Sequence, residues 1–190
     1  MGQLSKVLGG PPQLMAERLL GCHLTRTIDG EEVVCKIVEV EAYDQSEPAS
    51  HSYGGLTPRN SIMFGQAGYL YVYLSYGIHS CMNVVTGVEG HASAVLIRAV
   101  EPLVGLDVIR ANRPKILSDT MLTNGPGKAC QALAIDLSFN GHDLRKKPMI
   151  LSLQRQLAPS RITTTTRIGI TRAIDLKWRF YIKNNPYVSV

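Results

Sequence analysis

The sequence predicts a single mixed α+β domain built on a mostly antiparallel β-sheet. Hydrophobic residues occupy 45% of the 190 positions, which is enough to fill one core of ordinary domain size. Strand-like and helix-like segments do not alternate regularly, so a doubly wound parallel sheet fits the pattern poorly. No linker or change of composition divides the chain, and residues 1–190 are expected to form one domain.

The N-terminal part of the chain predicts a helix followed by a β-hairpin. Prolines at the start of residues 11–21 and a glycine at their end are typical of a short helix. Residues 24–26 and 33–42 have the composition of strands. Asp29 and Gly30, between them, tolerate the positive φ angles of a tight turn. We therefore expect two antiparallel strands joined at this pair.

A long loop and several further elements follow. Residues 46–65 are rich in Pro, Gly, Ser and His and show no sustained period, so they form either an ordered loop or a disordered one. The pattern of hydrophobic residues predicts strands at 69–76, 93–100, 167–170 and 179–183, and helices at 105–112 and 128–135. Long loops in compact domains are often functional.

The composition limits which partners, metal sites and cellular compartments are expected for the protein. Twenty Lys and Arg against fifteen Asp and Glu give a formal charge of +5, which suits a phosphate-rich partner but is shared by many proteins that bind no nucleic acid. The four cysteines are scattered without CxxC spacing, so neither a zinc site nor a disulfide framework is expected. No signal peptide and no membrane-spanning run is predicted. We expect an intracellular protein, in the cytoplasm or nucleoid of a bacterium or the nucleus of a eukaryote.

Two carboxylates lie at the end of the second predicted strand. A period of two residues places one set of side chains on a single face: Val33, Cys35, Ile37, Glu39, Glu41 and Tyr43. Both carboxylates could be exposed at the strand end or paired with arginines. The alternative is that one of them is partly desolvated and serves as a general base.

The next two segments offer a histidine and a cluster of tyrosines. His51 is either a hydrogen-bonded loop residue or a catalytic group. Tyr69, Tyr71 and Tyr73 share one strand face, which is equally typical of an aromatic ladder in a core. Tyr76 breaks this alternation. If residues 75–77 already form a turn, its ring lies at a hairpin tip and is a candidate wedge between base pairs.

An arginine interrupts the apolar run 94–100. Arg98 is predicted to face the same way as Leu96 and Val100, and a buried guanidinium requires an anionic partner. That partner is either a structural one, Glu39 or Glu101, or the functional one, Glu41 with its water, or a phosphate. The sequence leaves these alternatives open.

A glycine-rich segment precedes the helix predicted at 128–135. Residues 125–128, Gly-Pro-Gly-Lys, do not match a nucleotide-binding loop, because Leu122 and Ala129 stand where that pattern needs Gly and Ser or Thr. What remains is a helix start with amide donors and Lys128, which could hold one DNA phosphate.

Taken in order, the motifs resemble those of the alkyladenine (3-methyladenine) DNA glycosylase family. The motifs are Val-Glu-Ala-Tyr at 40–43, Pro-Ala-Ser-His at 48–51, Thr-Pro-Arg-Asn at 57–60, Met-Phe at 63–64, Tyr-Val-Tyr at 71–73, Tyr-Gly at 76–77, Cys-Met-Asn at 81–83 and Leu-Ile-Arg-Ala at 96–99. Shorter matches at 101–102, 124–128, 130–133, 167–169 and 179–181 extend the resemblance over most of the chain.

The resemblance implies a curved antiparallel sheet with flanking helices and a protruding β-hairpin that inserts into DNA. It assigns Glu41 as the general base and Arg98 as a residue that holds the water. Tyr43, His51 and Tyr73 become the walls around a flipped base, and Asn83 disfavours normal guanine. Tyr76 fills the gap left in the base stack. The role of His79, where some relatives have tyrosine, stays open. Candidate contacts to the DNA backbone are Arg59, Tyr71 and Lys128.

The implied activity is excision of damaged purines in base excision repair. Duplex DNA that contains alkylated or deaminated purines is the expected partner, with 3-methyladenine, hypoxanthine and ethenoadenine as candidate lesions. A carboxylate-activated water would cut the N-glycosidic bond and leave an abasic site. No lysine lies in the catalytic motifs, so a monofunctional enzyme is expected, acting as a monomer without metal or cofactor. The alternatives are a non-catalytic nucleic-acid-binding module and a glycosylase with lyase activity.

Overall fold

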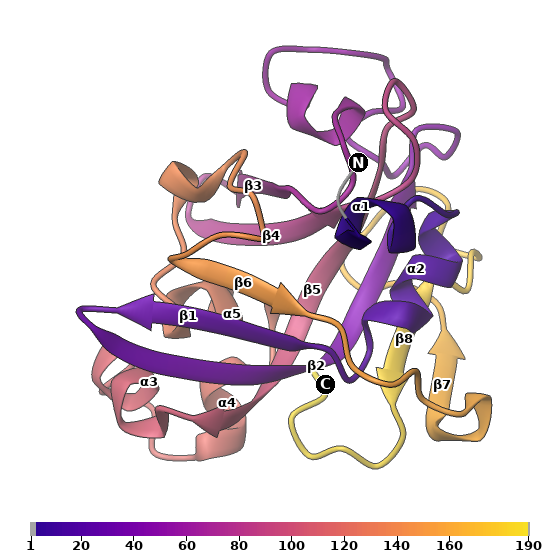
Figure 1. Ribbon diagram of the computed structural model, residues 1–190. Helices are drawn as coiled ribbons and strands as arrows, with labels where there is room; N and C mark the ends of the chain where they lie inside the picture. Colours follow the sequence, from indigo (N-terminus) through magenta and orange to yellow (C-terminus); the bar gives the residue numbers. More distant parts are fainter. Residues whose placement is uncertain (1–2, 190) are drawn as a thin grey trace.

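The computed structural model describes residues 3–189, which form helices around one curled antiparallel sheet (Figure 1). The sheet has eight strands, and six of them follow the order β3-β4-β5-β2-β1-β6, while β8 pairs with β2 and with β7. All of these pairings are antiparallel. The expected α+β fold is therefore confirmed. The strands are β1 (His23–Ile28), β2 (Glu31–Asp44), β3 (Leu70–Ser75), β4 (His79–Val85), β5 (Ser93–Val104), β6 (Met149–Ser152), β7 (Ile162–Thr165) and β8 (Arg179–Ile182).

Short helices cover the sheet. Helix α2 packs on β2 and β5, and α5 packs on β4 and β5. Leu8, Leu19, Leu133 and many strand residues are fully buried in the single main core between them. The helices are α1 (Gln3–Val7), α2 (Pro12–Leu19), α3 (Leu106–Asn112), α4 (Asp119–Thr123) and α5 (Pro126–Ala132), with 3-10 turns η1 (Ser61–Phe64), η2 (Leu137–Phe139) and η3 (Pro159–Arg161). No helix within residues 3–189 is long and apolar enough to cross a membrane.

Several predicted elements are confirmed, and one is wrong. Asp29 and Gly30 take φ angles of 50° and 89° in the turn between β1 and β2, as that turn requires. The strand predicted at 167–170 does not form. The chain there is irregular, Gly169 has a φ of 76°, and the amide of Ile168 donates to a side chain and not to a neighbouring strand. The helix predicted at 128–135 begins two residues earlier, at Pro126.

The long loop at 46–65 is ordered by its own hydrogen bonds. The side chain of Asn60, which is 1% exposed, donates from Nδ2 to the carbonyl oxygens of His51 and Gly55, at 2.9 Å each. Its Oδ1 accepts from the backbone amide of Thr57 at 2.7 Å. One buried amide thus closes the loop on itself and fixes the position of His51.

Strand β2 changes which side chains face the core half-way along its length. Its register with β5 shifts between Ile37 and Val40, which is the mark of a β-bulge. The buried core residues are odd-numbered before the shift and even-numbered after it: Val33, Cys35, Ile37, Val38, Val40 and Ala42. The prediction that all odd positions from 33 to 43 share one face is therefore wrong beyond Ile37.

Because of the same β-bulge, Leu96 and Val100 on β5 do not both face the same way as Arg98, contrary to what the sequence predicted. Leu96 lines a cavity with Arg98, whereas Val100 lies in the main core. The bulge thus turns Glu39, Glu41 and Arg98 away from the apolar core and toward one another, a use that β-bulges often have beside active sites.

Candidate active site

A cavity of about 760 Å³ opens beside the end of β2, which is within the usual size of ligand pockets. Strands β3, β4 and β5, the 48–51 loop and residues 168–172 form its other walls. The structure brings nearly all of the predicted site residues to its lining: Glu41, Tyr43, His51, Arg59, Tyr71, Tyr73, Tyr76, Asn83 and Arg98. Lys128 is the exception, because its Nζ donates to Asn124 Oδ1 at 2.8 Å outside this lining.

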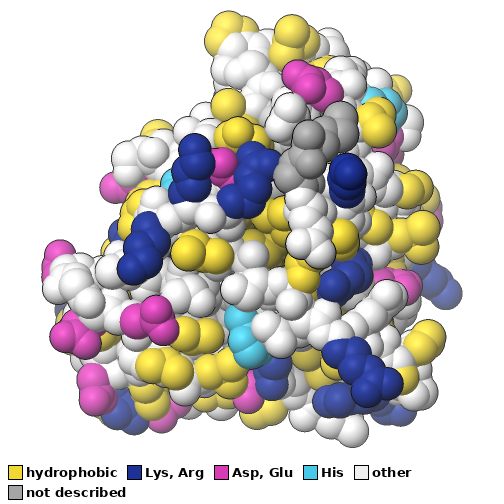
Figure 2. Space-filling model, viewed as in Figure 1, with side chains coloured by type: hydrophobic (Ala, Val, Ile, Leu, Met, Phe, Trp, Pro, Cys, Tyr) yellow, Lys and Arg dark blue, Asp and Glu magenta, His cyan; other side chains and the backbone are white. Residues whose placement is uncertain are grey.

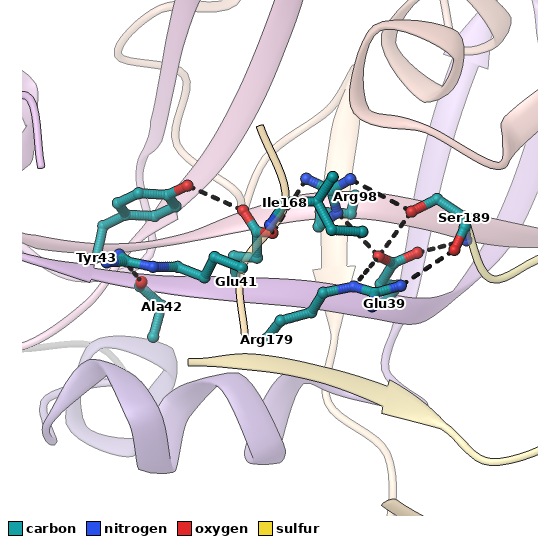
Figure 3. A network of polar contacts seen from close by, with 9 residues as sticks. Glu39, Glu41, Ala42, Tyr43, Arg98, Ile168, Arg179 and Ser189 are labelled. Carbon is teal, nitrogen blue, oxygen red and sulfur yellow. Dashed lines mark hydrogen bonds and ion pairs between the residues drawn. The ribbon is translucent and has the colours of Figure 1, made fainter. Parts of the chain in front are cut away.

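Glu41 is fully buried, and donors hold both oxygens of its carboxylate (Figure 3). Oε1 accepts from the backbone amide of Ile168 at 2.8 Å and lies 3.1 Å from Arg98 Nη1. Oε2 accepts from the hydroxyl of Tyr43 at 2.9 Å. Since a carboxylate has about four acceptor positions, a lone pair on Oε2 is left for a further donor such as water. These donors give the carboxylate a fixed orientation.

Arg98 forms an ion pair with Glu41, and it is buried to 7% exposure. Burial alone would lower the pKa of its guanidinium, but the charges of Glu41 and Glu39 outweigh that effect and raise the pKa. Its Nε donates to Glu39 Oε1 at 2.8 Å. Of the three glutamates considered from the sequence, Glu39 and Glu41 both pair with Arg98, whereas Glu101 pairs with Lys36.

Tyrosines and a histidine form the walls of the cavity. Tyr71 and Tyr73 stack with their ring centroids 5.6 Å apart, and the rings of His51 and Tyr73 meet nearly perpendicular with their centroids 4.4 Å apart. Partial desolvation, followed by the nearby charge of Arg59, lowers the pKa of His51, so its imidazole is neutral at pH 7. Burial raises the pKa of Tyr43 and that of Tyr73, and both phenols stay protonated.

Tyr71 does not lie where a contact to the DNA backbone would need it. Its side chain is 1% exposed, and its hydroxyl is 3.0 Å from Nδ1 of His51. A phosphate cannot reach a buried hydroxyl that already has a partner, so this prediction is revised. Tyr71 instead supports His51, while its carbonyl oxygen accepts from Nδ2 of Asn83 at 3.0 Å.

The hairpin between β3 and β4 presents Tyr76 at its tip. Tyr76 and Gly77 have φ angles of 52° and 70°, and the amide of Ile78 closes the turn on Ser75. A bulky residue with positive φ is uncommon and strained, so the turn holds this ring against a local preference. The side chain of Tyr76 is 88% exposed and that of Ile78 is 72% exposed. The hairpin thus ends in an apolar tip beside the cavity.

The segment that follows β7 contributes residues that sequence reasoning placed wrongly. Ile168 donates its amide to Glu41, and residues 168–172 line the cavity. Arg167 is buried behind Tyr43, with its guanidinium 4.6 Å from the ring centroid. It makes a two-pronged ion pair with Glu47 at 2.7 and 2.9 Å. In the sequence, the Arg-Ile-Gly motif at 167–169 is the signal that points to these residues, although its apolar pattern predicts a strand.

On the face drawn in Figure 2, the distribution of charge does not by itself locate a DNA surface. Figure 2 shows basic side chains scattered among acidic and apolar ones over the face that carries β1, β6 and α1. The excess of +5 is therefore not gathered into one patch on this face.

The family model for methylpurine-DNA glycosylase (MPG) matches residues 6–186. The chain belongs to the methylpurine-DNA glycosylase family. The resemblance drawn from the motifs is thereby confirmed, and the activity is that of a DNA glycosylase, a hydrolase that acts on damaged DNA in its repair.

Curated relatives agree with the family. A protein of Carboxydothermus hydrogenoformans is 50% identical over 177 residues, covering 93% of this chain and 92% of its own. A protein of Methanoculleus marisnigri is 50% identical over 181 residues, covering 92% of each chain. A third, from Rhodopseudomonas palustris, is 52% identical over 155 residues, covering 81% of this chain and 75% of its own. Each bears the name "Putative 3-methyladenine DNA glycosylase".

Proposed function

We propose that this glycosylase removes alkylated and deaminated purines from duplex DNA, with Glu41 as the general base. The candidate substrates are 3-methyladenine, hypoxanthine and ethenoadenine. The observation that supports this most directly is the Glu41 carboxylate, buried at the cavity wall with Oε1 fully occupied and Oε2 shared with one tyrosine hydroxyl. A base inside a duplex cannot reach such a group, so the nucleotide must first be flipped out.

The reaction proposed for the flipped nucleotide is a hydrolysis at the sugar carbon. As the N-glycosidic bond breaks, its electron pair leaves with the purine, and the sugar acquires oxocarbenium character that the carboxylate stabilises. Water donates a proton to Oε2 of Glu41, and its oxygen bonds to the sugar carbon. A cationic purine such as 3-methyladenine leaves as a neutral base. Hypoxanthine must also gain a proton.

The walls of the cavity suit the proposed substrates. The rings of Tyr43, Tyr73 and His51 offer faces and edges for stacking, and an electron-rich tyrosine face favours a cationic base by about 0.5–2 kcal/mol. Asn83 on β4 also lines the cavity, and in this proposal its side chain meets the edge of the purine. Among the described residues that line the cavity none is a lysine, which favours hydrolysis by water without a covalent Schiff base.

A base-release assay tests the proposal. Duplexes that contain methylated purines, hypoxanthine or ethenoadenine are incubated separately with the protein, and free base is measured by chromatography. Release of at least one of these bases, with no covalent product after borohydride treatment, is expected. Absence of release from all three duplexes would refute the substrate class. A trapped protein–DNA product would instead establish a lyase.

Replacement of Tyr76 by alanine is expected to weaken binding to lesion-containing duplex by roughly tenfold or more, since stacking of one base on an aromatic ring contributes about 1–3 kcal/mol. The thermal midpoint should hardly change, because the ring is 88% exposed. Fluorescence anisotropy with a hypoxanthine duplex measures the affinity. Leu117→Ala serves as the control, since that side chain is 97% exposed between α3 and α4, away from the cavity. Equal affinities for both variants would remove Tyr76 from DNA binding.

A further inference from the structure

The glutamate two residues before Glu41 is used by no step of the proposed reaction. Glu39 is fully buried and is not part of the cavity lining, so substrate and water cannot reach it. Its carboxylate nevertheless accepts from four donors (Figure 3): Arg98 Nε at 2.8 Å, Arg179 Nε at 2.7 Å, Ser189 Oγ at 2.8 Å and the amide of Ser189 at 2.6 Å. Three of these donors meet Oε1 and the amide of Ser189 meets Oε2, so both oxygens are held.

These contacts fix how Arg98 approaches Glu41. A guanidinium is a rigid planar fork, so holding one edge determines where the other nitrogens point. Glu39 holds Nε, and Ser189 Oγ lies 3.3 Å from Nη2. Only Nη1 is left to meet Glu41, at a single oxygen 3.1 Å away. Oε2 of Glu41 consequently stays with Tyr43 and open to a further donor.

The charges within this cluster also balance. Two carboxylates, Glu39 and Glu41, face two guanidinium groups, Arg98 and Arg179, and Arg179 lies directly opposite Glu41 in the pairing of β2 with β8. If Glu39 lost its charge, Glu41 would be the one remaining carboxylate for two cations. Arg98 would then be free to turn its fork and bind both oxygens of Glu41, because that two-pronged geometry is the preferred one.

We infer that Glu39 is a positioning residue for base excision, which divides Arg98 between two carboxylates and so keeps one oxygen of Glu41 available to water. The inference rests on the proposed role of Glu41. Glu39 acts through Arg98 and touches neither substrate nor water. Ser189, on the C-terminal segment after β8, completes the arrangement by binding Glu39 with its amide and Arg98 with its hydroxyl.

The test separates excision from binding. Single-turnover release of base and affinity for lesion duplex are measured for the wild type, Glu39→Gln and Glu101→Gln, at a temperature where circular dichroism shows each protein folded. Glu101→Gln is the matched control, because Glu101 pairs with Lys36 and Asn185 and does not contact Arg98. Glu39→Gln should release base about 10- to 100-fold more slowly, part of the full effect of a general base, with binding almost unchanged. Glu101→Gln should match the wild type.

A second variant decides the matter if Glu39→Gln does not fold. Ser189→Ala removes the hydrogen bond that the hydroxyl donates to Glu39 and the one that it accepts from Arg98, but it removes no charge, so it should fold and release base roughly 3- to 10-fold more slowly. Glu39→Asp, which keeps the charge on a shorter arm, should recover part of the rate. Wild-type rates in folded Glu39→Gln, or in Ser189→Ala when the former is unfolded, would overturn the inference. Absence of release by the wild type would instead overturn the proposed function.

Discussion

Glu41→Gln is expected to bind lesion-containing DNA with nearly wild-type affinity while base excision falls by roughly 10³-fold, within the range known for loss of a general base. Glutamine has the same shape and keeps an oxygen that can accept from Ile168 and Arg98, so the wall of the cavity should persist. It cannot take a proton from water, and it offers no negative charge to the developing oxocarbenium ion. Single-turnover release of hypoxanthine measures the rate.

Two comparisons make this result interpretable. Affinity for the same duplex, measured without turnover, shows whether the lesion still enters the site. Glu101→Gln carries the same chemical change at a glutamate of β5 that pairs with Lys36, outside the cavity lining, and should excise normally. If Glu41→Gln retained the wild-type rate, another group would have to activate the water.

Glu47→Ala is expected to lower the free energy of unfolding by about 3–5 kcal/mol, the usual cost of removing one partner of a buried ion pair. Glu47 and Arg167 are 4% and 6% exposed, and the guanidinium uses both terminal nitrogens on the carboxylate. Without Glu47, a cation would remain buried between the rings of Tyr43 and Trp178 with the carbonyl oxygen of Ala42 as its remaining polar partner. Urea denaturation followed by circular dichroism measures the change.

The control for this prediction is an ion pair on the surface. Asp107→Ala removes a partner of Arg110 on α3, where the aspartate side chain is 96% exposed, and should leave the denaturation midpoint unchanged. A loss of less than about 1 kcal/mol for Glu47→Ala, which is typical of an ordinary substitution, would show that Arg167 finds another anion or reaches water.

The sequence predicted those secondary-structure elements that depend on residues adjacent in the chain. The Asp29-Gly30 turn and strand β3 depend on neighbouring residues, and both are confirmed. The fold class also followed from the order of elements. Strand β4 was missed, because His79, Ser80 and Asn83 interrupt its apolar pattern and its strand geometry comes from pairing with β3 and β5.

The sequence predicted which residues form the site, but not how their side chains are arranged. The motifs named Glu41, Tyr43 and Arg98, and the structure brings these three together. The buried placement of Tyr71 and the amide that Ile168 donates to Glu41 depend on contacts between segments far apart in the chain. No spacing rule within one segment contains that information, and a strand was predicted where a loop meets the carboxylate.

The slip in register within β2 links folding to function in a way that a straight strand could not. Had the two strands aligned without it, the residues beyond Ile37 would exchange sides. Glu39 and Glu41 would then be driven among valines and leucines, and Val38 and Val40 would occupy the pocket. Ionised groups without partners in such a place are too costly to persist. Chains with the wrong alignment would therefore fail to fold. A folded chain consequently has the alignment that also forms the active centre.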